Sequence, residues 1–336
     1  MPTVSGVSAT DQLPGPDGKQ PLTGDRASTG RRGDRLFGGA ATLSGVVVIA
    51  MVSLIGIFLV VQAIPALTNN SASFFTSRVW EPGGDQPAFG IVEFLWTTVM
   101  ASVIAMTLAV PLGVGVALFL TQYAPLRMRG PAAALVDLLA AVPSIVYGLW
   151  GAKVLLPPYR EHVQDPLANA LGWIPLFERT SVSAGTILLV SIVLAIMILP
   201  IITALSREVF AQTPLTHKEG ALALGATRWE MIRTAVLPFG RPGVISASML
   251  GLGRALGETI AVTIILSTLP GGAPWSFSVF SGGETFASRI ANNASEFDTP
   301  AKTGAFIAAG LVLFVLTFAV NAVARIVIER RKAFTE

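Results

Sequence analysis

The chain has 336 residues, of which 52% are hydrophobic and 13% charged, and its formal net charge is +3. A charged share of roughly half that of a soluble domain, together with a mean hydropathy of +0.66, excludes an ordinary soluble protein and predicts an integral membrane protein. The absence of cysteine excludes disulfide bonds, thiolate catalysis and metal sites with Cys ligands.

The chain begins with a polar segment and continues with long apolar ones. Residues 1–35 are rich in Gly, Pro, Ser, Thr and charge and predict a disordered cytoplasmic tail. An apolar stretch of about 20 residues can cross the hydrocarbon layer as a helix. Six stretches qualify: Leu36–Leu67, Ile91–Tyr123, Pro131–Leu156, Ser181–Leu205, Pro242–Leu269 and Thr303–Ile328. We therefore expect an all-α protein with six transmembrane helices, a membrane domain over 36–330 and a short cytoplasmic tail over 331–336.

Lysine and arginine set the expected orientation. They are concentrated before the first span, between the fourth and fifth spans and after the sixth, and cytoplasmic loops carry such an excess. Both termini are therefore expected in the cytoplasm, which puts segments 68–90, 157–180 and 270–302 outside. The last of these is rich in Gly, Ser and Asn and is expected to be a surface loop. The net charge reflects membrane insertion, and nucleic-acid binding is not expected.

The third span contains a proline and several polar residues. Pro143 and Ser144 interrupt it, and a proline inside a membrane helix is tolerated where neighbours satisfy the freed carbonyl. Two interpretations stay open: a structural kink, or a polar groove to which Ser144 and Tyr147 contribute. Asp137 is either an ion-pair partner of an arginine in the fifth span or a group that reaches the interface or pairs with a loop arginine.

Residues 214–238, between the fourth and fifth spans, carry the local signals of a helical hairpin. Thr216 and Glu219 match a capping box at the start of a first helix. Gly225 matches the left-handed residue that ends such a helix.

A second capping box, Thr227 and Glu230, predicts a second helix, which is expected to end before Pro238. The apolar residues of the hairpin form either a docking surface for a partner or a face packed on the chain's own spans. They are Ala221, Leu222, Leu224, Trp229, Met231 and Ile232.

The fifth span carries two charges in its apolar middle, Arg254 and Glu258. A charge at the centre of a membrane helix costs about 2.5–3.5 kcal/mol on the most lenient scale, so it is rarely accidental. In a continuous helix the i,i+4 spacing would put both side chains on one face. The two form either a structural ion pair or part of a transport route, where the arginine offers donors to an oxyanion and the glutamate tunes it. Gly253 and Gly257 form a GxxxG pattern that predicts close helix packing.

The hairpin resembles the EAA loop of bacterial ABC importer permeases, whose pattern is EAA-x3-G-x9-I-x-L-P. Gly220 replaces the first alanine of this pattern and Ala235 its isoleucine. In that family the hairpin sits in a groove of the ATP-hydrolysing subunit and transmits its closure to the membrane domain. The resemblance therefore implies an ATPase-coupling hairpin made of Glu219, Gly220, Ala221, Gly225, Leu237 and Pro238.

Two further runs are similar to the permeases of the phosphate-specific transport (Pst) system. One is Val142-Pro-Ser-Ile-Val-Tyr147-Gly in the third span, and the other is Leu252-Gly-Arg-Ala-Leu-Gly-Glu-Thr-Ile-Ala-Val262 in the fifth. The second run is closer to the C subunit of that system than to the A subunit. The resemblance covers about residues 90–330 and implies the fold of a type I ABC importer permease. It implies a pathway for inorganic phosphate at Arg254, Glu258, Ser144 and Tyr147.

The resemblance also implies the setting and the partners. The chain would lie in a bacterial cytoplasmic (inner) membrane with a second, PstA-like permease, two copies of a PstB-like ATPase and an extracytoplasmic PstS-like phosphate-binding protein. A homodimer of this chain remains an alternative. No G-x-x-x-x-G-K-[ST] run is present, so we expect ATP hydrolysis in a separate subunit and neither enzyme activity nor a cofactor in this chain.

Three other functions fit the sequence less well. An ABC permease for another oxyanion, such as sulfate or molybdate, would share the hairpin but is not expected to carry both Pst-like runs. A membrane enzyme with a histidine metal site is not expected, because His162 and His217 lie in loops predicted on opposite sides. A sensor or scaffold that uses the hairpin for interaction is compatible with transport, and phosphate uptake separates the two.

Overall fold

The computed structural model describes residues 30–84, 86–180, 185–269 and 276–332. The chain divides into two compact units, Met1–Ile55 and Gly56–Glu336. In the first unit, the described residues belong to the N-terminal part of α1 (Gly30–Thr68). This helix begins inside the segment predicted as a tail, whose residues 1–29 lie outside the described residues, as do residues 333–336 of the predicted C-terminal tail.

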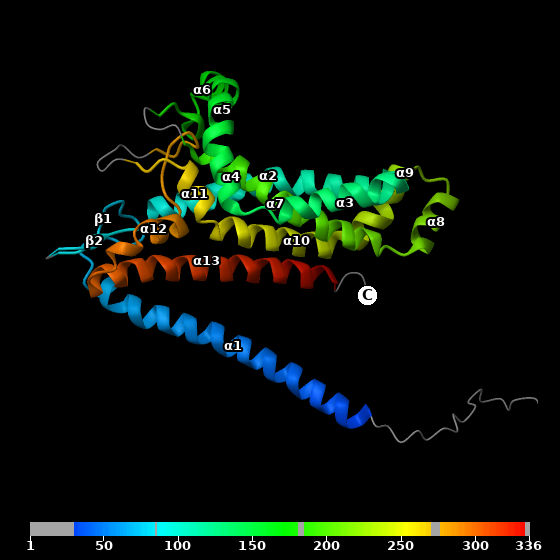
Figure 1. Cartoon of the computed structure of the whole chain (residues 1–336), viewed down its shortest axis with the longest axis horizontal. Coiled ribbons are helices and arrows are strands. Elements are labelled where there is room, and N and C mark those ends of the chain that lie inside the picture. The colour runs from blue at the N-terminus through cyan, green and yellow to red at the C-terminus, as the bar shows by residue number, and fades with distance from the viewer. Residues whose placement is uncertain (1–29, 85, 181–184, 270–275, 333–336) are drawn as a thin grey trace, which may run out of the picture. The chain divides into compact units, whose positions relative to one another are not determined.

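The second unit is almost entirely helical (Figure 1). Two short strands, β1 (Trp80–Glu81) and β2 (Ala88–Phe89), pair antiparallel with Trp80 opposite Phe89. π-helical turns at 119–123, 151–155, 160–164 and 232–236 follow α2, α4, α5 and α9 directly. In chain order the helices after α1 are α2 (Val92–Leu118), α3 (Leu126–Ala140), α4 (Ser144–Trp150), α5 (Leu156–Tyr159), α6 (Asp165–Leu171), α7 (Ile187–Ala211), α8 (Leu215–Ala223), α9 (Arg228–Met231), α10 (Leu237–Gly257), α11 (Ile260–Ile265), α12 (Phe286–Asn292) and α13 (Pro300–Lys332).

The predicted class, an all-α membrane protein, is confirmed. Within the described residues, five helical segments are long and apolar enough to cross a membrane, and the bent pair of α3 with 144–171 can be counted as a sixth. The five are Gly33–Thr68, Val92–Tyr123, Ile187–Ala211, Arg228–Gly257 and Pro300–Ile326.

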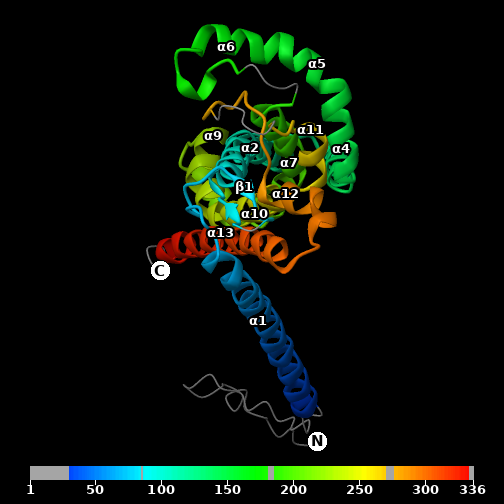
Figure 2. The same cartoon turned by 90° about the vertical axis from the view of Figure 1, so that its left-hand side faces the viewer.

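Helix α7 forms the centre of the second unit and is the most buried of the candidate spans. It packs along α2 and α10, as Figures 1 and 2 show from two sides. On α2 the buried residues Ala101, Ala105 and Ala109 recur every four positions and form a ridge of small side chains. A Cβ at Gly113, the next position of this ridge, would lie only 3.1 Å from the Ile202 side chain of α7. Small residues on α2 therefore let α7 approach closely.

The segment predicted to lie outside the membrane, 157–180, is helical as far as Leu171 rather than an irregular loop. The chain stays helical from Ser144 to Leu171, through the short helices α5 and α6 and two π-helical turns. Pro157 and Pro158 fall in the first turn of α5, where a missing N–H breaks no bond within that helix. The π-helical turns before and after α5 keep the helical path continuous.

The predicted third outside loop is also different from a surface loop. Residues 279–286 are buried, and the backbone N–H groups of Ile187 and Leu188 donate to the carbonyls of Ser281 and Val279. The tip of this loop, 270–275, lies outside the described residues. The part that follows the tip therefore packs into the bundle as part of its core.

Candidate functional site: two broken helices around Arg254

The third span is broken at residues 141–143, where α3 and the segment beginning at Ser144 meet at 88°. Pro143 has no N–H to donate to the carbonyl of Leu139, four residues back. The buried Tyr147 hydroxyl donates to that carbonyl instead, over 2.8 Å. The predicted interruption at Pro143 and Ser144 is confirmed, and Tyr147 stabilises the bend. Ser144 is the first residue of α4 and is half-buried.

The fifth span is not one continuous helix. Helix α10 ends at Gly257, Glu258 has extended backbone angles (φ −68°, ψ 127°), and α11 begins at Ile260. A Glu258 carboxylate oxygen accepts a hydrogen bond from the N–H of Ala261 over 3.2 Å. A carboxylate in this position satisfies a free N–H and interacts favourably with the positive end of the helix. The prediction of one helix over 242–269 is wrong, because Glu258 caps a second helix instead of extending the first.

Arg254 and Glu258 consequently do not share a helix face. No ion pair joins them in the part of the chain that the structure describes. Arg254 is half-buried in the last turn of α10, and its Nε is buried without a hydrogen-bond partner among the described residues. The next residue, Ala255, belongs to the same buried hydrophobic cluster as Tyr147. The structure thus brings together the arginine of the fifth span and the break in the third.

Asp137 does not pair with Arg254. Its carboxylate lies 3.5 Å from a guanidinium nitrogen of Arg207, in the last turns of α7. The pairing with Arg254 considered from the sequence is therefore wrong. The alternative of a loop arginine is met by Arg207, which follows the predicted fourth span but lies on a helix, because α7 extends to Ala211. The ion pair ties α3 to α7 on the hairpin side of the break.

Glycines bring the two broken helices into contact, but they are not the predicted ones. A Cβ at Gly148 would lie 3.0 Å from the Cα of Ala261, and one at Gly151 would lie 2.7 Å from the Ile265 side chain, so α4 packs tightly on α11. In contrast, Gly253 and Gly257 have no heavy atom within 4 Å of a built Cβ. No segment among the described residues packs closely against these two glycines, so the predicted close packing is not found there.

The hairpin at 214–238 begins differently from the prediction. Helix α8 starts at Leu215 after Pro214 and has no side-chain cap, so the predicted box of Thr216 with Glu219 does not form. Pro214 already occupies the N-cap position, which places Thr216 inside the first turn. Glu219 lies within α8, and Gly220, the departure from the family pattern, has open space around it.

The turn and the start of the second helix of the hairpin match the prediction. Gly225 has φ +86°, its N–H donates to the carbonyl of Leu222, and the N–H of Ala226 donates to the carbonyl of Ala221. These two bonds are the Schellman arrangement, which needs a left-handed residue at the glycine. Thr227 and Glu230 form the predicted reciprocal capping box.

The second helix does not end before Pro238. A π-helical turn at 232–236 joins α9 to α10, and Pro238 lies in the first turn of α10. An inserted residue of this kind accommodates a proline that would otherwise break a regular helix. The hairpin therefore runs directly into the fifth span, so a displacement of α9 acts on α10 without an intervening loop.

One side of the hairpin packs on the bundle and the other is exposed. Met231, Ile232 and Val236 are buried against Ala117 and Phe210. The exposed apolar side chains are Leu215, Leu222, Leu224 and Trp229, and Leu224 is 91% exposed. The interpretation of an internally packed face is confirmed for one side of the hairpin. The other side is an exposed apolar surface, and its use for docking a partner stays a prediction.

Sequence reasoning missed a buried charged cluster at the opposite end of the bundle. The Glu284 carboxylate accepts hydrogen bonds from Arg289, over 2.6 Å, and from Asn292, over 3.2 Å. The Arg289 guanidinium also lies 5.7 Å from the ring centres of Trp80 and Phe94. The sequence signal was a capping box, Thr285 with Ser288, which starts a helix inside the predicted surface loop.

These features describe a membrane protein built as a bundle of apolar helices. Two of its spans are broken near an arginine, and a helical hairpin lies at one end of the bundle. The family profile described as binding-protein-dependent transport system inner membrane component matches residues 109–333. The chain is thus a multi-pass membrane component of an importer.

Relatives narrow the assignment. The chain is 54% identical over 299 residues to the phosphate transport system permease protein PstC 2 of Mycobacterium tuberculosis, covering 88% of this chain and 91% of the relative. It is 38% identical over 306 residues to PstC of Mesorhizobium japonicum, covering 90% and 92%. Among solved structures, an inward-facing form of the MetNI methionine ABC transporter has a TM-score of 0.49 at 12% identity, covering 71% and 94%. The chain belongs to the PstC family of transport system permeases.

Proposed function

We propose that this chain is the permease subunit of an ATP-driven importer of inorganic phosphate and provides half of the translocation pathway. The observation that carries the proposal is Arg254, a half-buried arginine in a membrane helix whose Nε has no partner among the described residues. A guanidinium in such a place recognises an oxyanion through its planar set of donors. The chain is a transporter subunit and not an enzyme, and we expect it to need no cofactor.

The geometry around Arg254 supports weak, transient binding of phosphate during translocation. Glu258 is engaged at the start of α11 and leaves the arginine charge free for the substrate. Ser144, in the first turn of α4, would add a hydroxyl and helix N–H groups beside the same break, as discontinuous membrane helices do for anions. The Tyr147 hydroxyl is already used on Leu139, so we assign this tyrosine to positioning the pathway rather than to contacting phosphate.

The partners follow from membership of a binding-protein-dependent importer family, which implies an ATPase and a binding protein. We propose that the ATPase docks on the exposed apolar face of the hairpin, with Leu224 and Trp229 at its centre. The specific arrangement we favour is one PstA-like permease, two PstB-like ATPases, and a PstS-like protein at the end that carries β1, β2 and α12. A complex with only this permease would support the homodimer instead.

The test is radiolabelled phosphate uptake by proteoliposomes that contain the full complex. Arg254→Gln keeps hydrogen-bonding capacity and removes the charge, so uptake should fall at least tenfold while assembly and ATP hydrolysis persist. Arg254→Lys keeps the charge without the fork and should retain partial activity at best. Uptake by Arg254→Gln at the wild-type rate would refute the role of this arginine.

Glu258→Gln is the matched control for the same site. The amide oxygen can still accept from Ala261, so the helix cap and the assembly should survive.

Competition with sulfate and molybdate tests the alternative substrate. Displacement of phosphate by either anion at equal concentration would favour a permease for another oxyanion.

A further inference from the structure

A second cationic site lies at the hairpin end of α10, separate from Arg254. A groove of about 590 Å³ is lined by Arg233 and Arg241 together with the apolar side chains of Val114, Leu237, Val244 and Ile245. Both arginines are exposed, and none of the ion pairs within the described part of the chain involves either of them.

The π-helical turn at 232–236 explains why these two arginines share one face. Eight residues of regular α-helix would rotate the second side chain about 80° from the first. One extra residue taken up by the π-helical turn reduces this offset to roughly 20° and the axial separation to about 11 Å. Two arginine side chains at that spacing can reach a single group between them.

Within the described residues, neither arginine forms an ion pair with a carboxylate of the hairpin. The closest in sequence, Glu230, accepts hydrogen bonds of 2.8 Å from both the N–H and the hydroxyl of Thr227. The residues that line the groove include two arginines and no carboxylate, so the lining is positively charged and favours a ligand with negative charge. Arginine favours phosphate oxygens, to which it donates two parallel hydrogen bonds.

The apolar wall decides between the two sources of a phosphate group. Free inorganic phosphate is hydrated on all sides and gains nothing from aliphatic neighbours. A phospholipid places its phosphodiester between arginines and its acyl chain along apolar side chains at the membrane boundary. The walls contributed by Val114 from α2 and by Val244 and Ile245 from α10 match the second arrangement.

We propose that this groove is a binding site for an anionic phospholipid, with Arg233 and Arg241 holding the headgroup phosphate. The groove is lined by residues of both the π-helical turn at 232–236 and α10. A bound lipid therefore stabilises the connection between the hairpin and the fifth span. This site does not depend on phosphate transport, and its test does not measure uptake.

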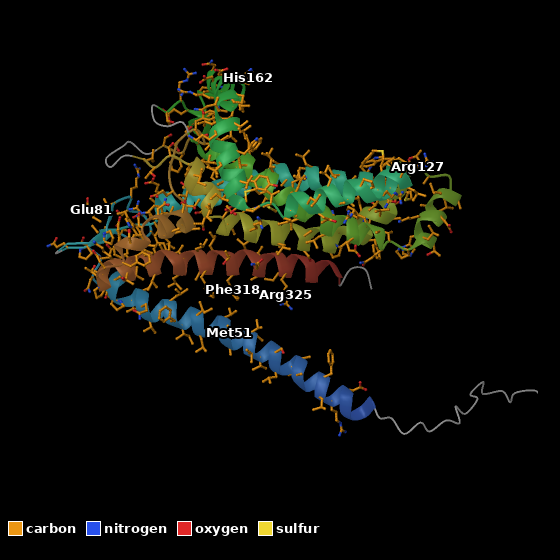
Figure 3. All side chains as sticks on the ribbon, in the orientation of Figure 1. Met51, Glu81, Arg127, His162, Phe318 and Arg325 are labelled. Atoms are coloured by element: carbon orange, nitrogen blue, oxygen red, sulfur yellow. The ribbon has the colours of Figure 1, made fainter. Side chains whose placement is uncertain are left out.

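The experiment uses the complete transporter complex, purified after incubation with vesicles of phosphatidylcholine and phosphatidylglycerol. Native mass spectrometry counts the phosphatidylglycerol that stays bound through detergent exchange. Changing both Arg233 and Arg241 to Gln should reduce retention on the order of tenfold, and each single change should have an intermediate effect. Arg127→Gln removes one exposed arginine at the same end of the bundle but outside the groove and should change nothing (Figure 3).

Two results would overturn the proposal. The first is wild-type retention of phosphatidylglycerol by the double variant, with assembly verified by size-exclusion chromatography. The second is binding of radiolabelled inorganic phosphate to the lipid-free complex that the double variant loses, with no preference for phosphatidylglycerol over phosphatidylcholine. That second result would assign the groove to free phosphate.

Discussion

The two ends of the bundle are built in different ways. At the hairpin end, Gly225 and the Thr227–Glu230 box close turns through hydrogen bonds between residues close in sequence. At the opposite end, the N–H of Phe286 donates to the hydroxyl of Thr98, 188 residues away. The hairpin's turns can be recognised from a few adjacent residues. The conformation of the segment around Phe286, in contrast, depends on its contacts with α2.

The largest expected effect concerns the buried ion pair at the outer end. Glu284→Ala removes the buried carboxylate that pairs with the half-buried Arg289 over 2.6 Å, and should lower the free energy of unfolding by about 2–3 kcal/mol. Asp298→Ala is the matched control, because its pair with Lys302 is an exposed i,i+4 contact that water screens, so its loss should cost much less. Thermal unfolding of the purified complex measures both. Equal shifts would mean that the outer end is held no more firmly than the surface.

The next largest effect on global stability is expected for a change at the break in the third span, which lies between the two ends of the bundle. Tyr147→Phe removes the 2.8 Å donor to the Leu139 carbonyl, which keeps a longer bond of 3.4 Å from the N–H of Val142, so a cost of about 1–1.5 kcal/mol is expected. Thermal unfolding gives the cost, and phosphate uptake shows whether the bend matters for transport. Tyr159→Phe is the control for loss of a hydroxyl, since its partner, the Thr186 hydroxyl, keeps a second bond to the N–H of Leu189. A smaller loss for Tyr147 than for Tyr159 would contradict the role given to the bend.

The predicted fold class and the break at Pro143 came from composition, apolar length and one proline, and these are properties of single segments. The break at Glu258 was not predicted, because no helix-start signal in the adjacent residues indicates a second helix. The carboxylate caps α11, and α11 is held by its contact with α4 through Gly148. The sequence singled out Arg254 and Glu258 because both are charges inside an apolar span. It could not show that they have different roles, since packing between distant segments makes Glu258 a helix cap and leaves Arg254 available.

The same limit explains the loop errors. Composition made 270–302 a surface loop because Gly, Ser and Asn are common in loops. Those residues are equally suited to close approach, as at Gly283, where a Cβ would lie 2.7 Å from the Thr97 hydroxyl. A segment with small polar residues can thus be exposed or tightly packed, and the partner helix determines which.

Two glycines of the hairpin give a matched test of local backbone control. Both Gly220 and Gly225 have open space around a built Cβ, so the only difference is backbone conformation. Gly225→Ala should destabilise the hairpin by about 1–2 kcal/mol because φ is +86°. Gly220→Ala lies inside α8 and should stabilise it by about 0.5–1 kcal/mol. Hydrogen exchange of residues 215–231 in the complex reports both signs, and the same sign for both would refute local control.

The smallest effect distinguishes the capping box that forms from the one that does not. Thr227→Ala removes the side chain that accepts from the N–H of Glu230 and should cost about 1 kcal/mol of hairpin stability. Thr216→Ala should be close to neutral, because Pro214 holds the N-cap position and no side chain caps α8. Hydrogen exchange at the first turn of each helix is the measurement, with ATP hydrolysis by the complex as a check on ATPase docking. A cost at Thr216 as large as at Thr227 would restore the capping box that the sequence suggested and would make both helices of the hairpin locally determined.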